Sequence, residues 1–132
     1  GTDVDPQAIE ASVANAAANG VAAEFLLPQA LTASAHRRFD VVVANILTNP
    51  LRLLAPALAL RVRPGGRIVL SGILEAQARD VVAAYGDWFT IDVWKAEDRW
   101  VALAGTRRTT AADRVPGAHR VPGDGLRPKP DD

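Results

Sequence analysis

Hydrophobic and polar positions follow one another along this chain in blocks that predict strands and helices in turn. In residues 39–51, a β-branched run without a charge after Asp40 is typical of a strand buried on both faces of a parallel sheet. The run stops at Asn45. Asn49 and Pro50 then favour the start of a helix, with Asn49 as the N-cap and Pro50 in the first helical position. Ligands of open α/β sheets bind beyond the carboxyl ends of the strands, so Asn45 is expected where such folds carry out their chemistry.

The other blocks continue this alternation of strands and helices. Asp5 and Pro6 predict the start of a helix that ends at Asn19-Gly20, with apolar residues on one face. Pro56 predicts a break between two short helices within residues 51–60. Further strands are predicted at residues 22–27, 68–70, 89–94 and 100–104, a polar connection at 29–38 and a helix at 74–85. This order predicts an α/β fold, mostly parallel, with a C-terminal antiparallel hairpin.

The composition of the chain excludes several classes of function. The 132 residues suffice for one domain, and 15 basic residues balance 15 acidic ones, so no strong field would attract nucleic acid or a membrane surface. There is no cysteine, which excludes disulfides and thiolate chemistry and fits a cytoplasmic protein. No apolar run is long enough to cross a bilayer. We therefore expect a cytoplasmic protein that binds neither membrane nor nucleic acid directly.

The composition changes near residue 106. Arg-Val-Pro-Gly occurs at residues 114–117 and again at 120–123, among many prolines and glycines and few apolar residues. Such a segment cannot offset the entropy of ordering, so residues 109–132 are predicted to be a disordered C-terminal tail. A passive extension is favoured over an interaction arm.

Three stretches carry a resemblance to a known family. Residues 1–8, 39–51 and 63–74 read GTDVDPQA, FDVVVANILTNPL and RPGGRIVLSGIL. They resemble the catalytic domain of the ribosomal protein L11 methyltransferases (PrmA), which are class I enzymes that use S-adenosylmethionine. The Pro-Gly-Gly turn is common to the whole superfamily, whereas the combination of ANIL, Pro50-Leu51 and SGIL is much narrower. The resemblance implies a partial, Rossmann-like methyltransferase catalytic domain over residues 1–108. It also implies an enzyme that methylates a lysine or another amine of a large-subunit ribosomal protein, without a metal.

The resemblance also implies roles for two residues. Asp3 matches the acidic residue that accepts hydrogen bonds from the ribose hydroxyls of the cofactor, for which a carboxylate offers several acceptor sites. Asn45 matches the position beside the cofactor's methyl group, where a side-chain carbonyl can accept a hydrogen bond from the amine nucleophile. We therefore expect Asp3 and Asn45 to bind cofactor and Asn45 to be catalytic. On the residues alone, Asp3 can also be a solvated strand-end acid, and Asn45 a turn residue that bonds its own backbone.

One expected motif is missing. In the superfamily a glycine-rich loop after the first strand wraps the methionine end of the cofactor, and no G-x-G-x-x-G pattern occurs in these 132 residues. We expect the chain to begin within the family's second strand, without the first strand and the glycine-rich loop. An isolated chain of this kind should bind S-adenosylmethionine weakly or not at all and should be inactive.

Other functions and residues remain open. The chain could be a class I methyltransferase of a small molecule or a nucleic acid, or a non-catalytic remnant or interaction module. His36 and His119 have no metal or triad spacing around them. The three tryptophans are expected to pack the hairpin against the sheet, with a base-stacking platform as the alternative; they are Trp88, Trp94 and Trp100.

Overall fold

The computed structural model describes residues 1–32 and 36–109. The chain divides into two compact units, Gly1–Arg38 and Phe39–Asp132. Except for Thr109, the predicted tail lies outside the described residues, and so does His119. In the part of the chain that the structure describes, no helix has the length and hydrophobicity that a membrane span requires.

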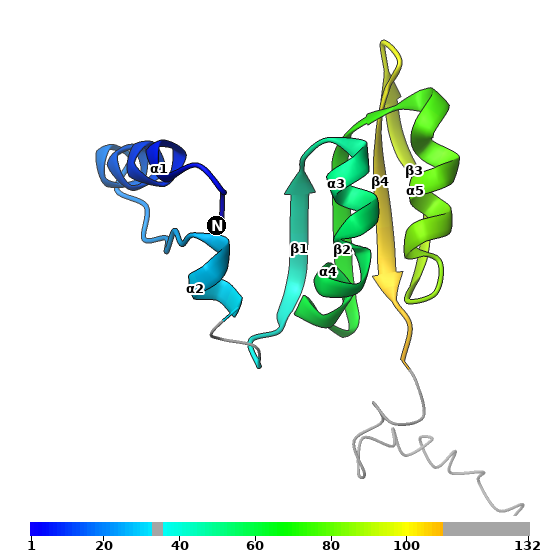
Figure 1. The fold of residues 1–132 in the computed structure, drawn as a ribbon, viewed down its shortest axis with the longest axis horizontal. Coiled ribbons are helices and arrows are strands. Elements are labelled where there is room, and N and C mark those ends of the chain that lie inside the picture. The colour runs from blue at the N-terminus through cyan, green and yellow to red at the C-terminus, as the bar shows by residue number, and fades with distance from the viewer. Residues whose placement is uncertain (33–35, 110–132) are drawn as a thin grey trace, which may run out of the picture. The chain divides into compact units, whose positions relative to one another are not determined.

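The first unit is built on α1 (Pro6–Ala18), which begins as predicted (Figure 1). Asp5 is the N-cap, and its Oδ1 accepts a 2.9 Å hydrogen bond from the backbone N–H of Gln7. The helix ends at Asn19, and Gly20 follows with φ +65°, a conformation that glycine adopts without strain. The two predicted helix signals are therefore confirmed.

The strands predicted in the first unit are shorter than expected. They form one parallel bridge, between Thr2 and Leu26. A second short helix, α2 (Pro28–Thr32), lies in the segment predicted to be a polar connection. None of the residues of α1 is fully buried, so the predicted apolar stripe of this helix is not part of a core within the unit. Isolated two-strand pairing is marginal without further strands or packing, which fits the single bridge.

The second unit contains a four-stranded sheet in the order β1-β2-β4-β3 (Figure 1). Its elements are β1 (Phe39–Asn45), α3 (Thr48–Leu53), α4 (Ala55–Arg61), β2 (Val62–Leu74), the 3₁₀ helix η1 (Glu75–Gln77), α5 (Ala78–Tyr85), β3 (Phe89–Glu97) and β4 (Trp100–Arg107). β1 and β2 are parallel, whereas β2–β4 and β4–β3 are antiparallel. The α/β class and the C-terminal antiparallel hairpin are confirmed.

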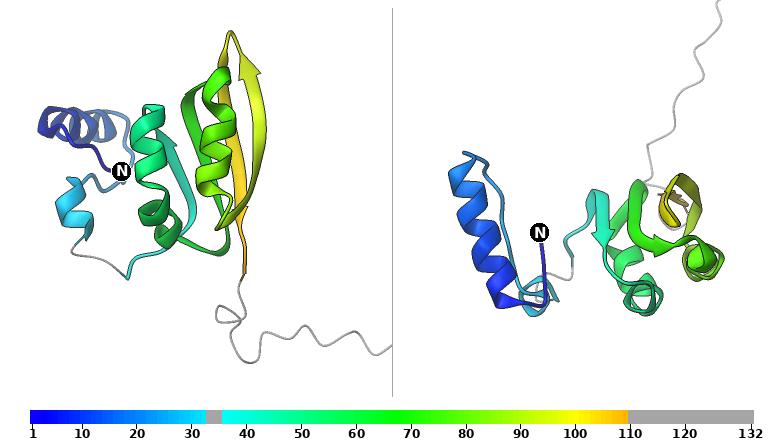
Figure 2. Two further views of the ribbon diagram at one scale, coloured as in Figure 1. Left: turned by 45° about the vertical axis from the view of Figure 1, so that its right-hand side comes forward. Right: turned by 90° about the horizontal axis from the view of Figure 1, so that it is seen from above.

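The core lies between the sheet and the helices α3, α4 and α5, which cover one of its faces (Figure 2). Its buried side chains are Leu51, Ala55, Ala59, Val62, Ile68, Leu70, Ile73, Ala78, Val81, Tyr85, Phe89, Val101 and Leu103. Burial of each large aliphatic or aromatic side chain is worth about 1.5–3 kcal/mol. Tyr85 adds a buried hydrogen bond, because its hydroxyl donates to the carbonyl of Leu51 at 2.7 Å. The core thus ties α5 to α3.

The prediction that β1 is buried on both faces is wrong. Val42 and Ala44 pack against the core, but Val41 is 56% and Val43 is 68% exposed. These two residues alternate with the buried ones and therefore lie on the other face of the sheet, which the described helices of the second unit leave uncovered (Figure 2). A β-branched run indicates a strand, but it does not report how many faces are covered.

The two helices between β1 and β2 separate as predicted, with α4 carrying Pro56 in its first turn. The predicted cap of α3 is wrong. The helix starts at Thr48, after Leu47, and Leu47 makes no side-chain capping bond. Asn49 therefore lies inside the first turn of α3. The Thr48 hydroxyl donates its hydrogen bond to Gln77, outside this helix.

The hairpin of β3 and β4 closes with a two-residue turn. Asp98 has φ 47° and Arg99 has φ 71°. Positive φ at both central residues is the geometry of a type I′ turn, whose twist matches that of the flanking strands. The backbone N–H of Glu75 donates to the carbonyl of Arg99 at 2.7 Å. This bond holds the turn against the end of β2 and so fixes the position of the next residue, Trp100.

Candidate functional site

The carboxyl ends of β1 and β2 meet at one edge of the sheet. The two strands are parallel, and Asn45 at the end of β1 is in register with Ser71 of β2. The side chain of Asn45 is exposed. Among the described residues, no hydrogen bond of its carboxamide is present, neither to its own backbone nor to a neighbour. The turn-residue explanation of Asn45 therefore has no support in the described geometry, and the carboxamide is available to a ligand.

Gly72 allows the two strand ends to come this close. It has φ +80°, and a Cβ atom at this position would lie 2.9 Å from Asn45 Oδ1 and 3.0 Å from the carbonyl oxygen of Ile46. The pairing of β2 with β4 also shifts register between Leu70 and Ile73, so that Ile73 returns to the core side three positions after Leu70. A glycine in a bulge therefore brings the carboxamide of Asn45 against the backbone of β2.

Asp3 lies in the first unit, directly after the bridge residue Thr2. Its side chain is exposed, and its Oδ1 accepts a 2.9 Å hydrogen bond from the backbone N–H of Asp5. One carboxylate oxygen therefore orders the turn into α1, while the exposed carboxylate retains further acceptor positions. Asp5 is fully explained by capping.

Two open hollows border the end of the sheet next to Asn45, and both are lined by Gly72 and Trp100. The larger has a volume of about 360 Å³ and is also lined by Leu47, Thr48, Asn49, Pro50, Leu74 and Gln77. The smaller, of about 280 Å³, is also lined by Ser71, Lys95, Glu97, Val101 and Ala102. We call the larger one the Gln77 hollow. Its walls are mainly apolar with a few polar side chains, and it is open to solvent.

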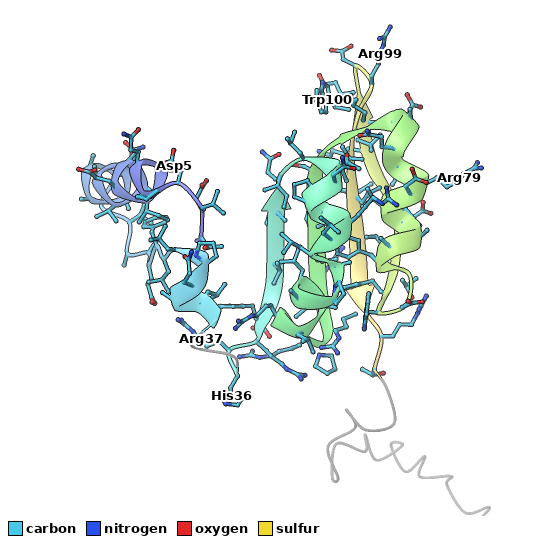
Figure 3. The ribbon with its side chains drawn as sticks, viewed as in Figure 1. Asp5, His36, Arg37, Arg79, Arg99 and Trp100 are labelled. Carbon is cyan, nitrogen blue, oxygen red and sulfur yellow. The ribbon has the colours of Figure 1, made fainter. Side chains whose placement is uncertain are left out.

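Trp100 stands between the two hollows. It projects from the base of the β3–β4 turn, next to Arg99 at the tip (Figure 3). Its side chain is 52% exposed and that of Trp94 is 58% exposed. The expectation that these two tryptophans pack the hairpin against the sheet is therefore wrong, whereas Trp88 does pack against the core. Trp94 instead lies under the ammonium of Lys95, which is 4.8 Å from its ring centroid.

The exposure of Trp100 could have been found in the sequence. In β4 the buried residues are Val101, Leu103 and Gly105, and Trp100 lies in the opposite phase of this alternation. Residues one position apart in a strand point to opposite faces, so Trp100 cannot share the core face with Val101. The large aromatic side chain of Trp100 suggested burial, but its position in the alternation of β4 indicates exposure.

Thr48 and Gln77 both line the Gln77 hollow, and their side chains are joined by a hydrogen bond. The hydroxyl of Thr48 is buried and donates to Gln77 Oε1 at 2.7 Å, across 29 positions of the sequence. No local pattern predicts this bond, because Thr48 belongs to α3 and Gln77 to η1. It is a product of the packing of these two elements.

The remaining candidates contribute little to this site. His36 is exposed, and in residues 1–32 and 36–109 no cluster of three or more His, Cys, Asp or Glu residues could hold a metal. Burial raises the pKa of Tyr85 to about 12, but its hydroxyl points into the core, to Leu51. Neither His36 nor Tyr85 therefore contributes to the site at the strand ends.

Comparison with known proteins identifies the family. Residues 1–108 match the sequence profile of "Ribosomal protein L11 methyltransferase (PrmA)". The ribosomal protein L11 methyltransferase of Cupriavidus metallidurans is 52% identical over 114 residues, which are 86% of this chain and 36% of that protein. The ribosomal protein L11 methyltransferase of Thiobacillus denitrificans is 56% identical over 108 residues, 82% of this chain and 36% of that protein. The chain thus spans about a third of the length of these relatives.

Solved structures support the same assignment. The ribosomal protein L11 methylase of Lactobacillus delbrueckii subsp. bulgaricus superimposes with a TM-score of 0.69 and 33% identity, over 82% of this chain and 57% of that one. The N-methyltransferase NodS of Bradyrhizobium japonicum, solved with S-adenosyl-L-homocysteine, has a TM-score of 0.61 and 18% identity, over 83% of this chain and 65% of that one; this likeness concerns the fold alone. The fold is that of a class I methyltransferase domain in part, and the chain belongs to the ribosomal protein L11 methyltransferase (PrmA) family.

Proposed function

We propose that this chain is the part of an S-adenosylmethionine-dependent N-methyltransferase that positions the amine which accepts the methyl group. The proposed substrate is an amine, such as a lysine side chain, of large-subunit ribosomal protein L11. The observation that carries the proposal is the free carboxamide of Asn45. It lies at the carboxyl end of β1 and against Gly72, which in turn lines the Gln77 hollow. This is the edge of an α/β sheet at which ligands bind. The working compartment is the cytoplasm, where ribosomal proteins are made, and no metal, nucleic acid or membrane takes part directly.

The residues of the chain fit the proposed cofactor. The exposed carboxylate of Asp3 uses one oxygen to accept from the N–H of Asp5, and its remaining acceptor positions suit the two hydroxyls of a ribose. When bound, S-adenosylmethionine would supply a methyl group on a positively charged sulfur, a good leaving group for in-line attack by a neutral amine. We assign Asp3 to the ribose and Asn45 to the methyl-transfer position.

Asn45 acts by alignment. Its Oδ1 can accept a hydrogen bond from one N–H of a neutral amine, which turns the nitrogen lone pair toward the methyl carbon. The amine must be unprotonated to attack, so the substrate ammonium loses a proton before transfer, and the methylated ammonium releases its proton to water afterwards. The apolar walls of the Gln77 hollow include Leu47, Leu74 and Trp100, which are exposed in the chain by itself, so water is excluded only where a bound substrate covers them. Positioning and exclusion of water are the main sources of catalysis for such a displacement.

A chimera tests this proposal. Residues 1–108 of this chain replace the matching third of the Cupriavidus metallidurans relative, and methyl transfer to ribosomal protein L11 is measured with radiolabelled cofactor. Asn45→Ala is expected to lower kcat about 100-fold and also to raise the Kd for cofactor, because Asn45 is assigned to both roles. Asp3→Ala is expected to raise that Kd about tenfold. Asn15→Ala, an exposed asparagine of α1, serves as the control and should leave both quantities unchanged.

The outcome separates the parts of the proposal. An Asn45→Ala chimera that transfers methyl groups at the parental rate would show that the carboxamide has no catalytic role. A chimera that binds cofactor but methylates only a small molecule or a nucleic acid would refute the ribosomal-protein substrate. A chimera that neither binds cofactor nor reacts would favour a non-catalytic interaction module.

A further inference from the structure

The Gln77 hollow contains a hydrogen-bond donor that the proposed mechanism does not use. Gln77 is half-buried, lines the hollow, and accepts the hydrogen bond of Thr48 through its Oε1 at 2.7 Å. A carboxamide also carries two N–H donors on its nitrogen. Among the described residues these two donors have no acceptor. They are therefore available to a ligand in the hollow.

Thr48 fixes the direction of these donors. Its side chain is only 7% exposed, and its hydroxyl is held at the start of α3, next to the core residue Leu51. Because the hydroxyl binds one end of the Gln77 carboxamide, the opposite end, which carries the nitrogen, is oriented as well. A buried hydrogen bond of this kind restricts the rotation of the carboxamide and reduces the entropy that a ligand must remove on binding.

We infer that Gln77 is a substrate-binding residue that donates a hydrogen bond to a main-chain carbonyl of the protein substrate, and that Thr48 is its positioning residue. This inference rests on the proposed function, which places a substrate amine at Asn45. The other walls of the hollow, Leu47, Pro50, Leu74 and Trp100, are apolar and suit the methylene stem that joins a lysine amine to its main chain. Gly72 lies against the Asn45 carboxamide and also lines the hollow. A stem that extends from an amine at Asn45 past Gly72 would therefore enter the hollow in which Gln77 can donate to a carbonyl.

Two ligands test the hydrogen bond from Gln77 to a substrate carbonyl separately from the binding of the amine and its stem. N-acetyl-lysine-N′-methylamide contains the amine, the stem and two amide carbonyls, whereas n-butylamine contains only the amine and the stem. Their binding to the full 132-residue chain is measured by NMR titration of the backbone and side-chain amides. We expect the blocked lysine to bind roughly fivefold more tightly than n-butylamine, as one neutral hydrogen bond allows. The side-chain N–H signals of Gln77 should shift only with the blocked lysine.

Variants then test the two roles. Gln77→Leu is expected to abolish the fivefold preference. Gln77→Glu keeps an acceptor for Thr48 but removes both donors, so the preference should also vanish, and any attraction of its charge acts equally on both cationic ligands. Thr48→Val should reduce the preference, and Thr48→Ser, which retains the hydroxyl, should restore it. Gln7→Leu, on the exposed surface of α1, is the matched control and should retain the preference.

Each result has a defined meaning. If the chain prefers the blocked lysine and Gln77→Leu keeps that preference, the inference is wrong while the proposed function stands. If the chain binds both ligands equally, the carbonyl contact does not exist and the inference is likewise wrong. If neither ligand binds and the chimera with ribosomal protein L11 is also inactive, the proposed function and the inference both fail. A preference that disappears in Gln77→Leu and Gln77→Glu supports the inference.

Discussion

Substitution of Gly72 by alanine tests whether the site at the strand ends has the geometry described above. Gly72 has φ +80°, and the added methyl group would lie 2.9 Å from Asn45 Oδ1 and 3.0 Å from the carbonyl oxygen of Ile46. Ordinary van der Waals contact begins near 3.4 Å. The alanine must therefore either displace the Asn45 side chain and the adjacent backbone or move β2 away from β1.

Two effects contribute to the loss of stability that Gly72→Ala should cause. A non-glycine residue in the left-handed region costs about 1–2 kcal/mol, and overpacking of one methyl group adds about 1–2 kcal/mol. Gly72→Ala is therefore expected to lower the free energy of unfolding by about 2–4 kcal/mol, a large share of the ~5–15 kcal/mol that stabilises a typical domain. Gly65, also in β2, has φ +78° but no atom within 4 Å of its would-be Cβ. Gly65→Ala should cost only the conformational part, about 1–2 kcal/mol.

Urea unfolding followed by tryptophan fluorescence measures this difference. All three tryptophans, Trp88, Trp94 and Trp100, lie in the second unit, so the signal reports the sheet that contains both glycines. The midpoint should shift further for Gly72→Ala than for Gly65→Ala at an unchanged m-value. In an Asn45→Ala background the cost of Gly72→Ala should fall by about 1 kcal/mol, because one of the two close contacts is gone.

Equal midpoint shifts for Gly72→Ala and Gly65→Ala would refute this reasoning. They would mean that the contact of Gly72 with Asn45 and Ile46 has no energetic weight. An unchanged cost of Gly72→Ala in the Asn45→Ala background would show that the carboxamide does not lie against Gly72.

Three further predictions concern the core and the isolated chain. Burial raises the pKa of Tyr85 from 10.0 to about 12; because the folded pKa is the higher one, its contribution to stability is present below pH ~10 and is lost as the pH rises toward ~12. Tyr85 is the one tyrosine of the sequence, so tyrosinate absorbance reports it directly, and a midpoint near 10 in the folded chain would contradict its burial. Tyr85→Phe leaves the Leu51 carbonyl unpaired and should cost about 1–2 kcal/mol. The isolated 132-residue chain, which has no G-x-G-x-x-G loop, should show weak or no binding of S-adenosylmethionine by calorimetry, and micromolar affinity would overturn that expectation.

Signals that act over a few residues were read correctly from the sequence in several places. Asp5 and Pro6 start α1, and Pro56 separates α3 from α4. The hairpin was predicted too, but the loop expected at residues 95–99 is a two-residue turn, because β3 continues to Glu97. Each depends on capping, on the ring of proline or on the twist of a short turn, all of which operate within one turn of chain. The same local reasoning placed the cap of α3 at Asn49, and failed because Thr48 finds a tertiary partner.

The sequence by itself determined the α/β class, the order of most elements, the family, and the position of Asn45 at the end of a strand. Only the tertiary structure decided what surrounds that residue. The approach of Gly72 to Asn45 and the bond between Thr48 and Gln77 both join segments far apart in the chain. The first arises from the register of β1 with β2, which is set by the packing of whole faces rather than by the residues next to one another. The second arises from the packing of α3 against η1.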